Sequence, residues 1–198
     1  MGLIAVVLVI IQGILGGLRV TEKSIVLAVV HGVTAQVFLS LLVAIAVVCT
    51  KTWRSDRAPL ASRSAGADRR IATIAVAALL IQIVFGAIQR HLVLGLMLHI
   101  VAAFVVAALT IAAGLRAWGL YPNESNLKRA GLTVLQATAT QLVLGFCAWI
   151  ARGAWTNGSL SLDWKVVVTT LHQGTGAVLL AAAVTLRLWM SRSLTPAR

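Results

Sequence analysis

Six long apolar runs constrain this chain more than any other feature of its sequence. They cover residues 2–18, 25–50, 71–89, 93–118, 130–151 and 165–190. A helix needs about 20 predominantly apolar residues, and at least about 17, to cross the hydrocarbon core of a bilayer. With 60% hydrophobic and 11% charged residues, the composition is typical of a polytopic membrane protein and excludes an ordinary soluble domain. The sequence therefore predicts an all-α fold with six transmembrane helices.

The basic residues lie between or beside these runs and divide unequally between the two sides of the membrane. Of the 17 lysines and arginines, 12 fall on the side of the loop 51–70 and of the C-terminus, and five fall on the other side. Because an excess of Lys and Arg marks the cytoplasmic side, we expect both termini in the cytoplasm of a bacterial-type inner membrane. The net charge of +12 is explained in this way, so we exclude nucleic acid as a partner.

The remaining features of the chain argue against a secreted protein. Cys49 and Cys147 both fall within apolar runs and do not form a disulfide framework of the kind found in small secreted domains. The chain begins Met-Gly-Leu-Ile without the basic segment of a signal peptide. The first run is also the shortest, which suggests that a further segment precedes it.

A helical hairpin with the same polar residues occurs three times. Each outgoing run carries a glutamine followed four residues later by a glycine, and each returning run carries a histidine followed four residues later by a small residue. The pairs are Gln12 and Gly16, Gln82 and Gly86, Gln141 and Gly145 on the outgoing runs, and His31 and Ala35, His99 and Ala103, His172 and Gly176 on the returning ones. Residues four apart share one helix face. The glutamine pattern alone indicates a close helix–helix contact with an amide hydrogen bond across it.

The histidines indicate a shared ligand. A single one would be explained equally well by a proton relay or a buried polar residue, but three occur at matched positions. Each lies about six or seven residues from the outer end of its run, about 9–11 Å deep at 1.5 Å per residue. Haem iron takes two axial ligands on opposite faces, and facing helices of a bundle can supply them. Zinc would need three or four converging ligands, and no run holds an acidic residue for a di-iron site or a carboxylate relay.

Haem is therefore the predicted cofactor, and other residues can be interpreted around it. Ala103 and Gly176 would leave room for the edge of a porphyrin beside the ligand. Arg90, at the outer end of the third run, could meet the haem propionates. We interpret the adjacent His91 as a residue of the rim and not as an axial ligand.

Five short motifs, spread over essentially the whole chain, resemble those of the haem A synthase family. They are Leu-Gly-Gly-Leu-Arg-Val-Thr at 15–21, His-Gly at 31–32, Gln-x-x-x-Gly-Ala-x-x-Arg-His at 82–91, Leu-His-Ile-Val-Ala at 98–102 and Leu-His-Gln-x-x-Gly-Ala at 171–177. The resemblance implies eight spans arranged as two four-helix bundles. It also implies oxidation of the C8 methyl of haem O to the formyl group of haem A, with electrons passed through a haem b.

By this resemblance, His99 and His172 ligate the iron of haem b in a complete four-helix bundle, residues 71–190. His31 ligates the iron of the substrate haem in residues 1–50, a two-helix remnant of the N-terminal bundle. Residues 51–70 form a basic cytoplasmic loop and 191–198 a cytoplasmic tail. Three hairpins are present where the family has four. The missing one would carry a histidine, a glutamate and a cysteine pair, so whether this chain alone is catalytic stays open.

Two functions are compatible with these observations. The first is a haem A synthase-like membrane oxidoreductase in cytochrome oxidase biogenesis. The alternative is a non-catalytic membrane b-type cytochrome or haem-carrying assembly subunit. A small-molecule transporter is disfavoured because no run resembles a broken helix with a midplane ion site. Beside the lipid bilayer, the candidate partners are a haem O synthase, cytochrome oxidase assembly factors and a second copy of the chain.

Overall fold

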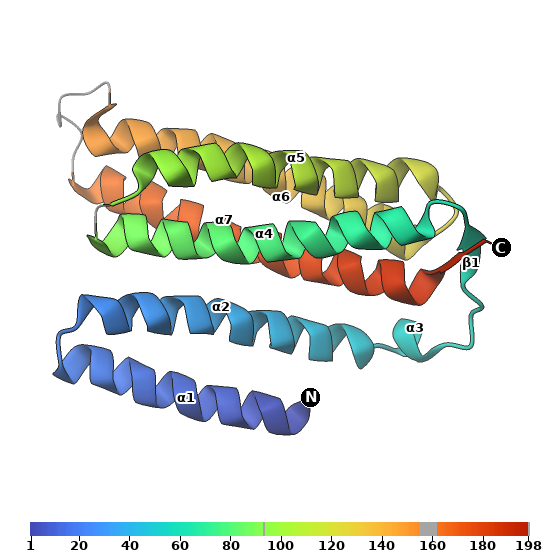
Figure 1. The fold of residues 1–198 in the computed structure, drawn as a ribbon, viewed down its shortest axis with the longest axis horizontal. Helices are drawn as coiled ribbons and strands as arrows, with labels where there is room; N and C mark the ends of the chain where they lie inside the picture. Colours follow the sequence, from blue (N-terminus) through green and yellow to red (C-terminus); the bar gives the residue numbers. More distant parts are fainter. Residues whose placement is uncertain (93, 155–161, 198) are drawn as a thin grey trace.

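A computed structural model describes residues 1–92, 94–154 and 162–197. It contains six long helices (Figure 1): α1 (Gly2–Thr21), α2 (Ile25–Val48), α4 (Ala65–Leu92), α5 (Leu96–Leu120), α6 (Ser125–Trp149) and α7 (Leu162–Ser193). Each is long and apolar enough to cross a bilayer, with mean hydropathy between 1.4 and 2.5. The prediction of an all-α chain with six apolar, membrane-type helices is therefore confirmed.

The helices continue beyond the apolar runs from which they were predicted. α4 begins at Ala65 and α6 at Ser125, so residues 65–70, which were expected to belong to a loop, form the first turns of a helix. Helix formation depends on backbone hydrogen bonds and not on hydrophobicity, so polar residues can extend a spanning helix beyond the bilayer core. After α6 the chain continues into a short π-helix, η1 (Ile150–Ala154).

Helices α4 to α7 form a four-helix bundle. Each packs against two neighbours in the order α4, α5, α6, α7 and back to α4, so that α5 and α7 lie diagonally opposite. Helix α2 packs beside α4 and α7, and α1 packs mainly against α2 at the edge of the molecule (Figure 1). Neither α1 nor α2 contains a buried residue, which is compatible with a lipid environment, because apolar side chains need no burial there.

The hydrophobic core fills only one half of this bundle. Its largest fully buried apolar side chains are Leu127, Val134, Leu180, Leu186, Met190 and Leu194. In the same half α5 and α6 cross at two glycines, where a Cβ added to Gly131 would lie 2.7 Å from the carbonyl oxygen of Gly114. Small residues at such crossings allow two backbones to touch. We call this half, together with the adjacent strands, the strand end.

Two short strands were not predicted. β1 (Leu60–Ser62) pairs in parallel with β2 (Leu194–Pro196), close to a single helical turn, α3 (Lys51–Arg54). The guanidinium of Arg192 donates hydrogen bonds to the carbonyl oxygens of Trp53, Ser55 and Arg57 at 3.2, 2.5 and 3.0 Å. The segment between α2 and α4 is therefore tied to the end of α7, and residues 194–197 are joined to it by the strand pairing and by the bond from the backbone nitrogen of Ala197 to the carbonyl oxygen of Ser62.

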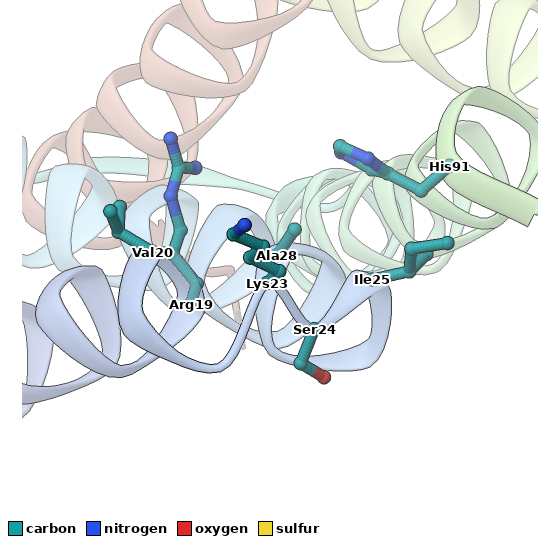
Figure 2. Close-up of a pocket in the computed structure, with 7 residues that line it drawn as sticks. All are labelled: Arg19, Val20, Lys23, Ser24, Ile25, Ala28 and His91. Carbon is teal, nitrogen blue, oxygen red and sulfur yellow. The ribbon is translucent and has the colours of Figure 1, made fainter.

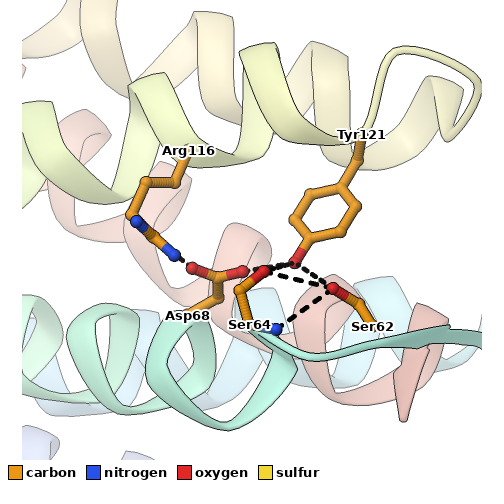
Figure 3. A network of polar contacts seen from close by, with 5 residues as sticks. All are labelled: Ser62, Ser64, Asp68, Arg116 and Tyr121. Atoms are coloured by element: carbon orange, nitrogen blue, oxygen red, sulfur yellow. Dashed lines mark hydrogen bonds and ion pairs between the residues drawn. The ribbon is translucent and has the colours of Figure 1, made fainter. Parts of the chain in front are cut away.

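A buried polar network joins β1, α4 and α5 at the strand end (Figure 3). The carboxylate of Asp68, 0% exposed, forms an ion pair with Arg116 and accepts a hydrogen bond from the hydroxyl of Tyr121. The hydroxyls of Ser64 and Ser62 lie 3.1 and 3.4 Å from the same phenolic oxygen. A buried charge needs such partners, so this network fixes how β1 lies against the bundle.

Candidate functional site

The opposite end of the molecule, which we call the histidine end, contains the α1–α2 and α4–α5 turns (Figure 1). Here each span histidine packs against a glycine of the preceding long helix. A Cβ added to Gly16, Gly86 or Gly145 would lie 3.3, 3.2 or 3.0 Å from Cε1 of His31, His99 or His172, respectively. The absent side chain of each glycine thus makes room for an imidazole ring. The hairpin pattern that occurs three times in the sequence therefore corresponds to a glycine–histidine contact that occurs three times in the structure.

The glutamines form the hydrogen bonds expected between the helices. The side-chain amides of Gln12 and Gln82 donate to the carbonyl oxygens of His31 and His99 at 3.4 and 2.9 Å. In the third hairpin the amide nitrogen of Gln141 instead lies 3.5 Å from Nε2 of His172. The interpretation of Gln-x-x-x-Gly as a close contact with an amide bond across it is therefore confirmed for the first two hairpins, and the third uses the histidine ring.

Thr175 explains the different arrangement of the third hairpin. Its hydroxyl donates to Oε1 of Gln141 at 2.5 Å, which turns the amide nitrogen towards the ring of His172. A Cβ added to Gly176 would lie 3.2 Å from that nitrogen. Thr175 was not predicted to be a site residue, although its position three residues after His172, on the same helix face, was a usable signal.

His99 and His172 are brought together. Their ring centroids lie 6.4 Å apart and their planes are nearly perpendicular, at 89°. They come from the diagonal helices α5 and α7, so the two rings face each other across the bundle. His31, on α2, makes no ring contact with another histidine among the described residues.

The prediction that each histidine lies six or seven residues from the outer end of its helix holds for His31 and differs for His99 and His172. His31 is the seventh residue of α2, His99 the fourth of α5 and His172 the eleventh of α7. The rings of His99 and His172 nevertheless lie at one level, because α7 extends further outwards than α5. Counting from the ends of apolar runs therefore gave only a coarse measure of depth.

The bundle around the two rings contains few buried side chains. Among the described residues, those buried in the outer turns are Gln89, Ala148, Ala151 and Val168, and Leu79, Val106, Ala107 and Thr138 are buried further inwards. The continuous apolar core extends from Leu79 and Val106 into the strand end.

One nitrogen of each ring lies on the edge that packs against the glycine, where Nδ1 is 3.5–3.7 Å from the position of an added Cβ. Nδ1 of His31, of His99 and of His172 is buried without a hydrogen-bond partner. Buried polar atoms are nearly always satisfied, and an exception calls for a missing group such as an ion or a water molecule. No cluster of three or more His, Cys, Asp or Glu side chains suited to a metal occurs in the described parts of the chain. The histidines brought together are thus one pair, His99 and His172.

The other predicted site residues are less closely connected to this pair. Ala103 is half-buried one helical turn after His99, and Arg90 is exposed in the last turn of α4. His91 lies away from the histidine pair and lines an open hollow with residues of the α1–α2 turn (Figure 2). This hollow could not be predicted from the sequence, since α4 and that turn are far apart along the chain.

No protein-family model, curated protein or solved structure matches this chain. The resemblance to haem A synthases therefore stays a prediction based on its short motifs.

Proposed function

We propose that this chain is a membrane haem protein with an electron-transfer role, similar to haem A synthases, in which α4 to α7 hold a haem b between His99 and His172. The observation that carries the proposal is the contact between these two rings. Two imidazoles bound to opposite faces of one iron, each at about 2.0–2.1 Å, have ring centroids roughly 6 Å apart. The 6.4 Å separation matches that requirement.

The residues around the pair bear on this role in two ways. Gln82 holds the backbone of α5 at His99. The amide nitrogen of Gln141, whose oxygen accepts from Thr175, lies 3.5 Å from Nε2 of His172 and would have to leave this nitrogen when it binds iron. The glycines behind the rings, Gly86 and Gly145, leave each ring only one close-packed position. The apolar helices exclude water from the surroundings of the pair. When bound, the haem would supply a one-electron carrier.

The oxidation of haem O to haem A belongs to the same proposal and rests on the motif resemblance. In that function His31 would ligate the iron of the substrate haem, and the chain would work in a bacterial-type inner membrane with both termini in the cytoplasm. Cytochrome oxidase assembly proteins and a haem O synthase are the proposed partners.

One observation favours the second candidate, a non-catalytic b-type cytochrome or haem-carrying assembly subunit. Among the described residues the only buried carboxylate is Asp68, which lies at the strand end and is ion-paired with Arg116. Oxidation of a methyl carbon develops positive charge that a nearby carboxylate would stabilise. No such group lies beside His31 in the described part of the chain, whereas electron transfer through His99 and His172 needs none.

Optical spectroscopy of the purified full chain tests the haem proposal. We expect a b-type reduced-minus-oxidised spectrum that His99→Ala and His172→Ala each abolish. Gln173→Ala, which changes an exposed polar residue next to His172, is the matched control and should retain the spectrum. If both histidine variants kept full haem content, the assignment of the ligands would be wrong.

Co-expression with a haem O synthase separates the two candidates. Extraction and chromatography of the haems would reveal haem A if the chain is an oxidase, and His31→Ala should then abolish the conversion while haem b remains. Unchanged haem O together with a normal b-type spectrum would favour the non-catalytic cytochrome.

A further inference from the structure

The open hollow at the histidine end has a composition that the haem proposal does not use. It has a volume of about 390 Å³ and is lined by Arg19, Val20, Lys23, Ser24, Ile25, Ala28 and His91. Two of these side chains are permanent cations and a third is an imidazole, and none of the seven is acidic. Figure 2 shows that His91 approaches from α4, whereas the other six belong to α1, α2 and the turn between them.

The cations of this hollow form no ion pair with an acidic residue in the described part of the chain. Among the described residues the ion pairs join Arg57 to Glu124 and Arg116 to Asp68, so Arg19 and Lys23 are left without a carboxylate. Glu22 lies between them in the sequence but does not line the hollow. Unpaired cations around one concave surface attract an anion.

The backbone of the α1–α2 turn adds to this attraction. The turn takes three residues, Glu22 to Ser24, and Lys23 adopts a left-handed conformation with φ of 47°. α2 therefore begins directly at the hollow, with Ser24 as its N-cap, accepting from the backbone nitrogen of Leu27 at 3.3 Å. The first N–H groups of a helix have no partner within the helix, and together they favour a negative group near its N-terminus.

Two residues of the rim, Val20 and Ile25, are apolar and exposed. Val20 is 65% exposed and Ile25 51%, and both belong to helices with the length and hydropathy of membrane spans. An anion that brings its own hydrocarbon would therefore satisfy the cations and the rim at the same time. Helix ends with Arg and Lys lie at the level of the lipid phosphates in a bilayer.

We propose that this hollow binds the phosphate group of an anionic phospholipid, with Arg19, Lys23 and His91 around the headgroup and the acyl chains along Val20 and Ile25. Because His91 is on α4 and the other residues are on the first hairpin, the lipid links this hairpin to the four-helix bundle. The proposal does not depend on haem binding.

The test measures retention of phosphatidylglycerol by the full chain in detergent, using native mass spectrometry against phosphatidylcholine as the zwitterionic reference. A basic residue near an anionic lipid surface contributes about 1 kcal/mol, which corresponds to a roughly fivefold change in affinity. We expect Arg19→Gln and Lys23→Asn each to weaken retention by roughly fivefold. Asn accepts the left-handed backbone of Lys23, so this variant removes the charge without straining the turn.

Two further variants serve as controls. Arg152→Gln removes an exposed cation of η1 that does not line the hollow and should leave retention unchanged. Arg19→Lys keeps the charge and should retain most of the phosphatidylglycerol binding of the parent chain. Retention that was equal in the parent chain and in the double variant Arg19→Gln/Lys23→Asn would overturn the proposal.

Two other outcomes would also overturn it in favour of a different anion. Displacement of phosphatidylglycerol by millimolar inorganic phosphate would indicate a site for free phosphate. Loss of the b-type spectrum in the double variant, with unchanged lipid retention, would indicate that the cations hold haem propionates.

Discussion

The glycines behind the histidine rings offer a direct test of how the site is built. Gly145→Ala would place a Cβ 3.0 Å from Cε1 and 3.5 Å from Nδ1 of His172. Alanine is intrinsically better than glycine within a helix by about 0.5–1 kcal/mol, whereas inserting an atom into a packed contact costs about 1–3 kcal/mol. The clash therefore equals or outweighs the gain, and we expect a net loss of about 0–2.5 kcal/mol in the free energy of unfolding.

Gly174→Ala is the matched control, because a Cβ at Gly174 meets nothing within 4 Å. It should be as stable as the parent chain or more stable. Unfolding of the detergent-solubilised full chain by added SDS, followed by far-UV circular dichroism, measures both variants. The effect should decrease from Gly145 through Gly86 to Gly16, as the contact lengthens from 3.0 to 3.2 and 3.3 Å. Equal stability of Gly145→Ala and Gly174→Ala, together with equal haem content, would refute the reasoning.

Three further predictions concern the strand end and the orientation of the chain. Asp68→Asn should lower the free energy of unfolding, measured by SDS titration, by about 3 kcal/mol. This is the lower end of the range for a broken buried ion pair, because Arg116 is 35% exposed. The control Asp56→Asn changes an exposed residue of the preceding loop and should have little effect. Burial, and next the hydrogen bond to Asp68, raise the pKa of Tyr121. The phenolate absorbance of Tyr121, the single tyrosine of the chain, should therefore titrate above the usual pKa of about 10 in the folded chain. The stability that this shift contributes should be present below about pH 10 and lost as the pH rises through the folded-state pKa. A folded-state midpoint at or below about 10 would contradict this. A reporter active only outside the cytoplasm should be silent after Ala61 and active after Gly95, and the reverse result would invert the orientation predicted from the basic residues.

The features that could be predicted from the sequence are those that depend on local spacing. Each spanning helix follows from its own apolar run, because length and hydropathy are properties of one segment. The contact between Gln82 and the backbone at His99 was also predictable, since two consecutive helices joined by a short turn must lie antiparallel. Gln82 and Gly86 share one helix face and so meet the returning helix together.

Features that depend on segments far apart in the chain were not predictable in this way. β1 and β2 are separated by more than 130 residues, and nothing in either short segment specifies its partner. Asp68 was assigned to a basic loop, although a single acid among arginines, three residues before the apolar run at Ile71, was a signal for a buried ion pair. His91 was predicted to lie at the rim of the site. Its neighbours Arg19 and Lys23 could not be predicted, because they depend on how the first hairpin packs beside α4.

The two halves of the α4–α7 bundle differ in what stabilises them, and this difference separates stability from ligand binding. At the strand end, side chains such as Leu180 and Met190 are completely buried and α5 touches α6 through glycines, so packing alone specifies one arrangement. At the histidine end, specific polar contacts of Gln82, Gln141 and Thr175 hold the helices, and Nδ1 of each span histidine has no hydrogen-bond partner. Removing a histidine ring from this half leaves the apolar core intact. Histidine variants should therefore lose the cofactor while the helices remain folded, which is the condition under which loss of a spectrum identifies a ligand.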